Sequence, residues 1–224
     1  MYDVQGNLKR VLADLPEGVS LVAVSKYHPK EYIEAAYREG QRIFGESHEQ
    51  ELRDKHSQLP ADIEWHFIGH LQTNKVKYIV PYISMIEAVD SLKLLREIDK
   101  QAAKADRRID VLLELHIAAE ETKYGLTPDE CRQLLAGGEW RGLSHVRICG
   151  LMMMASNVDD AEQIATEFRT AHRLFDELKA LYFAHDDYFR VRSWGMSHDY
   201  RIAIAEGSTM VRVGTTIFGP RVYV

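Results

Sequence analysis

A short apolar run near the start of the chain ends on a single lysine: Leu21-Val22-Ala23-Val24-Ser25-Lys26. Apolar, β-branched residues in such a run indicate a buried strand. A lysine at the mouth of a buried strand can extend its ammonium group into water. It can also be held partly desolvated, where an ammonium pKa falls and the amine becomes a nucleophile able to form a Schiff base. Lys26 by itself favours the first interpretation, but the rest of the chain favours the second.

Three residues at the ends of the last two predicted strands could bind an anion. Ser197 precedes a predicted helix, so we expect it to be the N-cap of that helix. Backbone N–H groups at a helix start, together with a hydroxyl, bind anions. Gly214 allows a close backbone approach, and Thr215 adds another donor. Taken alone, Ser197 could be only a helix cap and Gly214 only a tight packing point. Because both follow the last two predicted strands, where (β/α)8 barrels frequently bind phosphate, their combination favours a phosphate site.

Arg212 lies in an otherwise apolar strand, two residues before Gly214. Strand alternation places both residues on the same side of the sheet. A buried arginine must be paired or held against a ligand, and an ion pair with Glu114 is the simpler alternative. A lysine, an interior arginine and a phosphate site around one opening suit a phosphorylated aromatic molecule that carries a carbonyl group. Pyridoxal 5′-phosphate has these three features.

Eight strand-like segments position these residues, at 20–26, 42–46, 63–68, 83–89, 110–117, 146–154, 189–194 and 210–218. Seven of them are followed by a helix-like segment, and this alternation is typical of a parallel sheet with crossover helices. Eight such units predict a single α/β domain over residues 1–224, a closed (β/α)8 TIM barrel whose active site lies at the C-terminal ends of the strands. The alternative is an open doubly wound sheet, which usually has a glycine-rich turn after its first strand. That turn is missing here.

Composition and residue spacing argue against several classes of protein. The net charge of −6 over 224 residues argues against nucleic-acid binding. Two distant cysteines, Cys131 and Cys149, fit a reduced, cytoplasmic protein. No segment reads as a signal peptide or as a membrane span. His66 and His70 straddle a strand end, and no cluster has zinc spacing, so we expect no metal site.

Seven segments along the chain carry a resemblance to a known family. They are Ala23-Val24-Ser25-Lys26, Phe44-Gly45-Glu46, residues 65–75, Lys123-Tyr124-Gly125-Leu126, Gly150-Leu151-Met152, Gly195-Met196-Ser197 and residues 207–219. Together they resemble the pyridoxal phosphate homeostasis proteins, single-domain relatives of the alanine racemase barrel (fold type III of the pyridoxal phosphate proteins). The resemblance departs at Ser47, where asparagine often follows Phe-Gly-Glu, and at Met153-Met154-Ala155-Ser156, which replaces a threonine-containing run.

The resemblance implies roles for individual residues. Lys26 would be the Schiff-base lysine, and Arg212 would face the pyridine nitrogen. Asn74, at the start of the helix after the third strand, would support the pocket wall. The phosphate would be bound by Ser197, Gly214 and Thr215.

The arginine also bears on activity. An arginine, with a pKa above about 12, cannot give a proton to the ring nitrogen, so the ring would be a weak electron sink. In the two-domain racemases of this fold, the second base comes partly from an additional β domain, for which we expect no room in a chain that ends at Val224. We therefore expect a cytoplasmic monomer that binds pyridoxal phosphate and hands it to enzymes requiring it, with little turnover. Two alternatives are an amino-acid racemase and a cofactor-free barrel enzyme acting on a phosphorylated sugar.

Overall fold

The computed structural model describes residues 2–117 and 124–220. Neighbouring strands pair in parallel around the ring, and β1 pairs with β8 to close it. The predicted TIM barrel is therefore confirmed, and the open sheet is excluded. The strands are β1 Ser20–Val24, β2 Ile43–Glu46, β3 Glu64–Phe67, β4 Met85–Val89, β5 Ile109–Leu115, β6 Val146–Met153, β7 Val191–Ser193 and β8 Met210–Val213.

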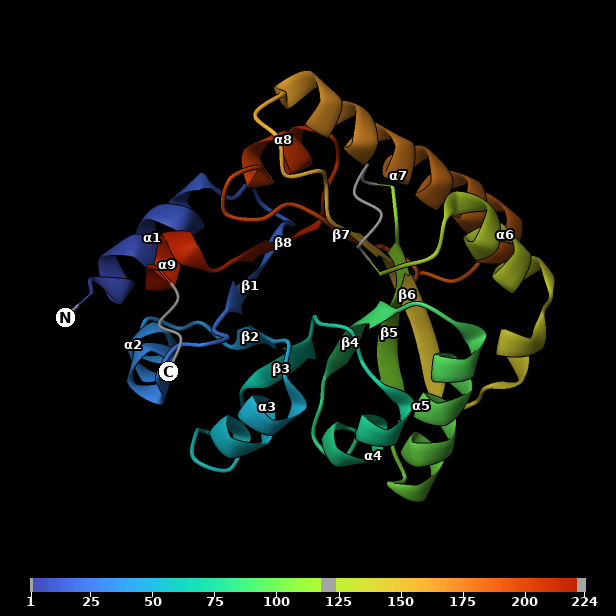
Figure 1. Cartoon of the computed structure of the whole chain (residues 1–224), viewed down its shortest axis with the longest axis horizontal. Coiled ribbons are helices and arrows are strands. Elements are labelled where there is room, and N and C mark those ends of the chain that lie inside the picture. The colour runs from blue at the N-terminus through green and yellow to red at the C-terminus, as the bar shows by residue number, and fades with distance from the viewer. Residues whose placement is uncertain (1, 118–123, 221–224) are drawn as a thin grey trace.

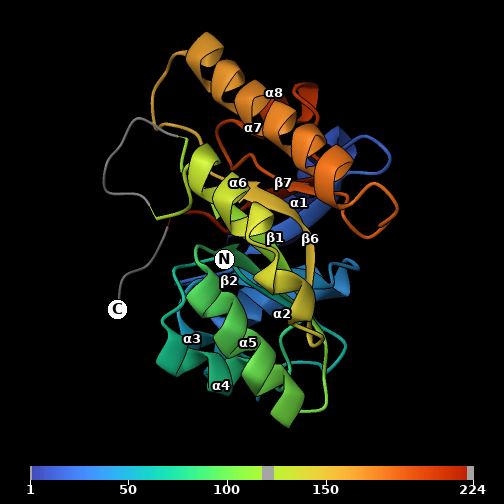
Figure 2. The same ribbon diagram turned by 90° about the vertical axis from the view of Figure 1, so that its right-hand side faces the viewer.

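Helices surround the ring of strands (Figures 1 and 2). Such an arrangement follows from parallel pairing, because each crossover must return along the outside of the sheet. The helices are α1 Val4–Asp14, α2 Lys30–Arg38, α3 Glu49–His56, α4 Val76–Ile79, α5 Leu92–Lys104, α6 Pro128–Ala136, α7 Ala161–Tyr182, α8 Tyr200–Ala205 and α9 Thr215–Phe218, with short 3-10 helices η1 Thr73–Lys75 and η2 Glu139–Gly142.

Local signals set several helix ends. The Ser91 hydroxyl accepts a hydrogen bond from the backbone N–H of Leu94 and begins α5. Thr127 and Glu130 form the predicted capping box ahead of α6, with the proline at its first position. Gly40 follows α2 with a φ of 93°, a left-handed conformation that glycine adopts without strain.

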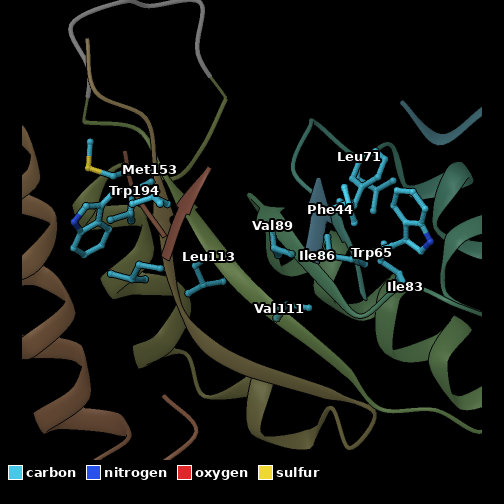
Figure 3. Packing of buried hydrophobic residues seen from close by; sticks show 14 of the residues in the cluster. Phe44, Trp65, Leu71, Ile83, Ile86, Val89, Val111, Leu113, Met153 and Trp194 are labelled. Carbon is cyan, nitrogen blue, oxygen red and sulfur yellow. The ribbon is translucent and has the colours of Figure 1, made fainter. Parts of the chain in front are cut away.

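Most of the core lies between the strands and the helices. Phe44 and Trp65 pack there with ring centroids 6.1 Å apart, and Figure 3 shows Leu71 beside them. Burying side chains of this size contributes about 1.5–3 kcal/mol each. A smaller apolar cluster, which includes Leu112 and Met152, is separate from this layer. Alternation along β5 separates the two layers, since Val111 and its odd-numbered neighbours belong to the outer cluster.

The last predicted strand is too long. The prediction ran from 210 to 218, but β8 ends at Val213 and the residues after Gly214 form α9. The N–H groups of Ile217 and Phe218 both donate to the carbonyl oxygen of Gly214 at 2.9 Å, and the Asn7 amide of α1 donates to the Ile217 carbonyl oxygen at 3.2 Å. Packing against α1 therefore overrides the strand preference of this β-branched run.

Candidate functional site

A cavity of about 270 Å³ lies at one end of the barrel, where the C-terminal ends of the parallel strands meet. Five of the predicted site residues line it: Lys26, Ser197, Arg212, Gly214 and Thr215. The remaining lining residues are Val24, His28, Ile68, Met154, Met196 and His198.

Lys26 lies in the turn that directly follows β1 and is partly buried. Its neighbour Ser25 is fully buried, and the Ser25 hydroxyl donates to Glu46 at 2.6 Å. An amine on a rigid strand exit, beside a cavity with apolar side chains, is partly removed from water. Such a position suits a lysine that reacts with a carbonyl group.

The anion site forms between the turn after β7 and the turn after β8. The Ser197 hydroxyl accepts hydrogen bonds from the N–H groups of Gly214, at 3.2 Å, and Thr216, at 3.4 Å. A Cβ atom at Gly214 would lie 3.0 Å from the carbonyl oxygen of Val24, so the close approach predicted for this glycine is present. Hydroxyls and backbone N–H groups are the kinds of donor that bind a phosphate, and both kinds meet at this point.

The predicted capping role of Ser197 is wrong. Helix α8 begins at Tyr200, and Asp199 is the residue that precedes it. The Asp199 N–H donates to the Met196 carbonyl oxygen at 3.1 Å, and the Asp199 carboxylate accepts from the Met196 N–H. These bonds close a turn before the helix, and this turn directs Ser197 toward β8.

Arg212 is buried beneath the cavity, with 3% of its surface exposed. Its guanidinium donates to the Ser193 carbonyl oxygen at 2.6 Å, to the Ser193 hydroxyl at 2.7 Å and to the Met153 carbonyl oxygen at 2.8 Å. The carboxylate paired with it is Glu87, 3.7 Å away, and not the Glu114 that the sequence suggested. Both glutamates are buried, but only Glu87 is in direct reach.

Glu87 connects Arg212 to a second buried group. It accepts a hydrogen bond from the Ser193 hydroxyl at 2.6 Å and lies 2.7 Å from Nδ1 of His66. Burial alone would raise the pKa of Glu87, but the His66 hydrogen bond, followed by the charges of His66 and Arg212, outweighs it and lowers the pKa. The carboxylate therefore stays ionised and compensates the charge of Arg212.

One predicted site residue, Asn74, lies elsewhere. Asn74 is exposed in η1 and borders a separate hollow with Thr73 and Asp90, so it does not line the cavity. Lys123, part of one matching motif, lies outside the described residues. Conversely, the sequence reasoning did not single out His28 and His198, although each lies within two residues of a predicted site residue at a strand exit.

The described part of the chain meets the requirements of neither a metal site nor a membrane-spanning helix. Over residues 2–117 and 124–220, no group of three or more metal-binding side chains gathers in one place. No helix within those ranges is long and apolar enough to cross a membrane.

The donor set fits a flat, phosphorylated carbonyl compound. An amine, a buried guanidinium and an anion site surround a space whose walls include Val24 and Ile68. Pyridoxal phosphate has a group to match each of these. The residues present therefore fit the cofactor that the sequence suggested.

Comparison with known proteins gives a consistent result. The model of the alanine racemase N-terminal domain matches residues 3–222. The pyridoxal phosphate homeostasis protein of Aquifex aeolicus is 40% identical over 205 residues, which make up 91% of this chain and 87% of that protein.

Solved structures extend the likeness to three dimensions. PipY of Synechococcus elongatus, solved without PLP, has a TM-score of 0.90 and 34% identity, covering 96% of this chain and 100% of PipY. Its form with PLP bound has a TM-score of 0.87 at the same identity and coverage. Alanine racemase of Clostridium difficile, with a TM-score of 0.74 and 14% identity over 97% of this chain and 56% of the racemase, shares the fold.

Proposed function

We propose that this chain, which belongs to the family of pyridoxal phosphate homeostasis proteins, binds pyridoxal 5′-phosphate and takes part in its intracellular homeostasis. The observation that carries the proposal is the convergence of Lys26, Arg212 and the Ser197–Gly214 anion site on one cavity. Amino-acid balance would be affected indirectly, through the supply of the cofactor.

Each group has a task in this proposal. When bound, the cofactor supplies an aldehyde that condenses with amines and a ring that withdraws electrons. Lys26 would hold the aldehyde through its amine, with the carbonyl oxygen leaving as water. Ser197, Thr215 and the backbone at Gly214 would hold the phosphate. Arg212 would face the ring nitrogen.

Arg212 favours storage over turnover. Its guanidinium keeps its proton in a protein, so it cannot protonate a ring nitrogen. Glu87 strengthens this assignment, because the buried carboxylate stabilises the charged form of the arginine. A ring left unprotonated withdraws few electrons, which disfavours reactions that pass through a carbanion.

The proposal includes the cellular setting. Cys131 and Cys149 are both free and buried, as in a protein of the reducing cytoplasm. Enzymes that require pyridoxal phosphate are the partners that would receive it, and the chain would act as a monomer. Because Lys26 is only partly buried, water would reach its covalent bond to the cofactor. Hydrolysis of that bond would free the cofactor for transfer.

A comparison of two aldehydes tests the proposal. Titration of the protein with pyridoxal phosphate, followed by visible absorbance and equilibrium dialysis, should give saturable binding. Pyridoxal, which lacks the phosphate, should bind at least about a hundredfold more weakly, because two or more charge-assisted hydrogen bonds are lost. Equal affinity for the two aldehydes would contradict the phosphate site.

Solvent-deuterium exchange distinguishes storage from the alternative function, amino-acid racemisation. The imidazoles of His28 and His198 line the cavity and are candidate second bases beside Lys26. We expect the loaded protein to exchange the α-protons of common amino acids no faster than free pyridoxal phosphate does. Rapid exchange with any one amino acid would establish the racemase instead.

A further inference from the structure

Behind the cavity, on the side facing α3, lies a lysine that the proposed function does not use. Lys55 is buried, and its side chain is 9% exposed. Its ammonium donates to the Ser25 carbonyl oxygen at 2.8 Å, to Oε1 of Glu46 at 2.8 Å and to Oε1 of Glu51 at 2.6 Å. An ammonium group has three protons, and each has an acceptor here. A buried lysine with a complete set of acceptors is held in one place.

The same cluster holds the main chain on both sides of Lys26. Before it, the Ser25 hydroxyl donates to Oε1 of Glu46 at 2.6 Å. After it, the backbone N–H of Tyr27 donates to Oε1 of Glu51 at 2.6 Å. Lys55 bonds both of these carboxylates and the Ser25 carbonyl oxygen as well.

Tyr27 shows why such a restraint is needed. Its φ is 63°, in the left-handed region that residues with a Cβ atom rarely adopt. A turn that contains this conformation persists only where surrounding contacts impose it. The Glu51 carboxylate on the Tyr27 N–H supplies one such contact, and Lys55 holds that carboxylate in place.

We propose that Lys55, acting with Glu46 and Glu51, is a positioning residue that fixes the Ser25-Lys26-Tyr27 turn and so presents the Lys26 amine to the cofactor cavity. This inference rests on the proposed function. Lys55 borders a different hollow, on the outer side of the turn, and does not line the cavity itself. It acts on the bound molecule only through Lys26.

The electrostatics of Glu46 agree with this arrangement. Burial raises the pKa of Glu46 to about 7, and the Lys55 ammonium is the main influence that opposes the rise. Without that cation the carboxyl would be neutral near pH 7, and it would lose the charge that binds the Ser25 hydroxyl.

The test separates placement of Lys26 from general stability. For the full-length protein, equilibrium dialysis measures all bound pyridoxal phosphate. Borohydride reduction with peptide mass mapping measures the part attached to Lys26. Lys55→Met should lower the attached fraction of the bound cofactor about tenfold, and Lys55→Arg should restore much of it. Lys30→Met is the matched control, because Lys30 borders the same hollow and donates to Gln58 rather than to the Lys26 turn.

A second variant keeps the inference testable if Lys55→Met does not fold. Glu51 is 22% exposed, so Glu51→Ala leaves no deeply buried void and removes the acceptor of the Tyr27 N–H. It should lower the attached fraction about threefold. An attached fraction that stays at the wild-type value in the folded variants would overturn the positioning role, even if total binding falls. Absence of the adduct from the wild-type protein would instead refute the proposed function.

Discussion

Arg212 should be among the residues whose replacement most weakens the fold. In an Arg212→Met variant, Glu87 keeps its burial but loses its nearby cation, 3.7 Å away in the native protein. The carbonyl oxygens of Ser193 and Met153 also lose their guanidinium donor. Breaking one side of a buried ion pair costs about 3–5 kcal/mol, because the remaining charge loses its partner. Glu87 then keeps its contacts with His66 and Ser193 but has no guanidinium beside it. We therefore expect the free energy of unfolding to fall by roughly that amount.

A double-mutant cycle assays this coupling. Urea unfolding at pH 7 is measured for the wild type, Arg212→Met, Glu87→Gln and the double variant. The double variant should be about 1–3 kcal/mol more stable than the sum of the two single losses predicts, because the second substitution removes the stranded charge. An Arg212→Met loss below about 1 kcal/mol, or additive losses, would mean that Arg212 and Glu87 are not coupled.

The pH dependence of the same variant gives a second check. The pKa of Glu87 is lowered in the folded protein, so its contribution to stability is present above the unfolded pKa and is lost as pH falls through the folded value. Without Arg212 the folded pKa rises. Acid unfolding of Arg212→Met should therefore begin at a higher pH than that of the wild type.

Three further predictions concern separate features. Burial, and then the charge of Asp90, raise the pKa of Glu114 to about 7, so the native state binds the extra proton and stability should fall by about 3 kcal/mol as pH rises from about 4.5 to 7. For Glu114→Gln, the free energy of unfolding should change less across this pH range than it does for the wild type. An equal change in the two proteins would contradict the raised pKa of Glu114. Gly195 has a φ of 97°, and an added Cβ would lie 2.6 Å from the Cβ of Ala203, so Gly195→Ala should cost about 2–4 kcal/mol in thermal or urea unfolding. A loss below about 1 kcal/mol would mean that the turn relaxes freely. Because Asn74 is exposed and outside the cavity, Asn74→Ala should change pyridoxal phosphate affinity by less than about threefold in dialysis, whereas a large loss would support the role that the resemblance implies.

The barrel was predictable because its signals are local and repeated. Each strand is a short apolar run, and most crossover helices carry their own start or stop, such as Ser91 and the Thr127 capping box. The segment after Gly214 was not predictable in this way. Its β-branched residues favour a strand, and the helix forms through packing against α1, which is about 210 residues away in sequence.

The cavity lining was predictable for a topological reason. Strand exits in a parallel barrel meet at one rim, so Lys26, Arg212 and Gly214 could be placed together without knowing any distance. The supporting contacts could not be found in this way. Glu87 of β4, and not Glu114 of β5, lies 3.7 Å from Arg212, and the sequence alone does not give this distance.

Lys55 was missed for a related reason. In sequence it belongs to a polar helix, α3, and polar helices are usually solvated. Its contacts with Ser25 and Glu46 depend on how α3 docks beside β1 and β2. A lysine in a helical segment carries no local sign that its ammonium group is buried.

The most direct test of the account is the site of covalent attachment. The protein is saturated with pyridoxal phosphate, reduced with borohydride, digested and mapped by mass spectrometry, with Lys26→Ala as the control. We expect one pyridoxyl group per chain, carried by Lys26 and missing from the Lys26→Ala protein. Reduction that leaves Lys26 unmodified, or that labels the control protein equally, would contradict it.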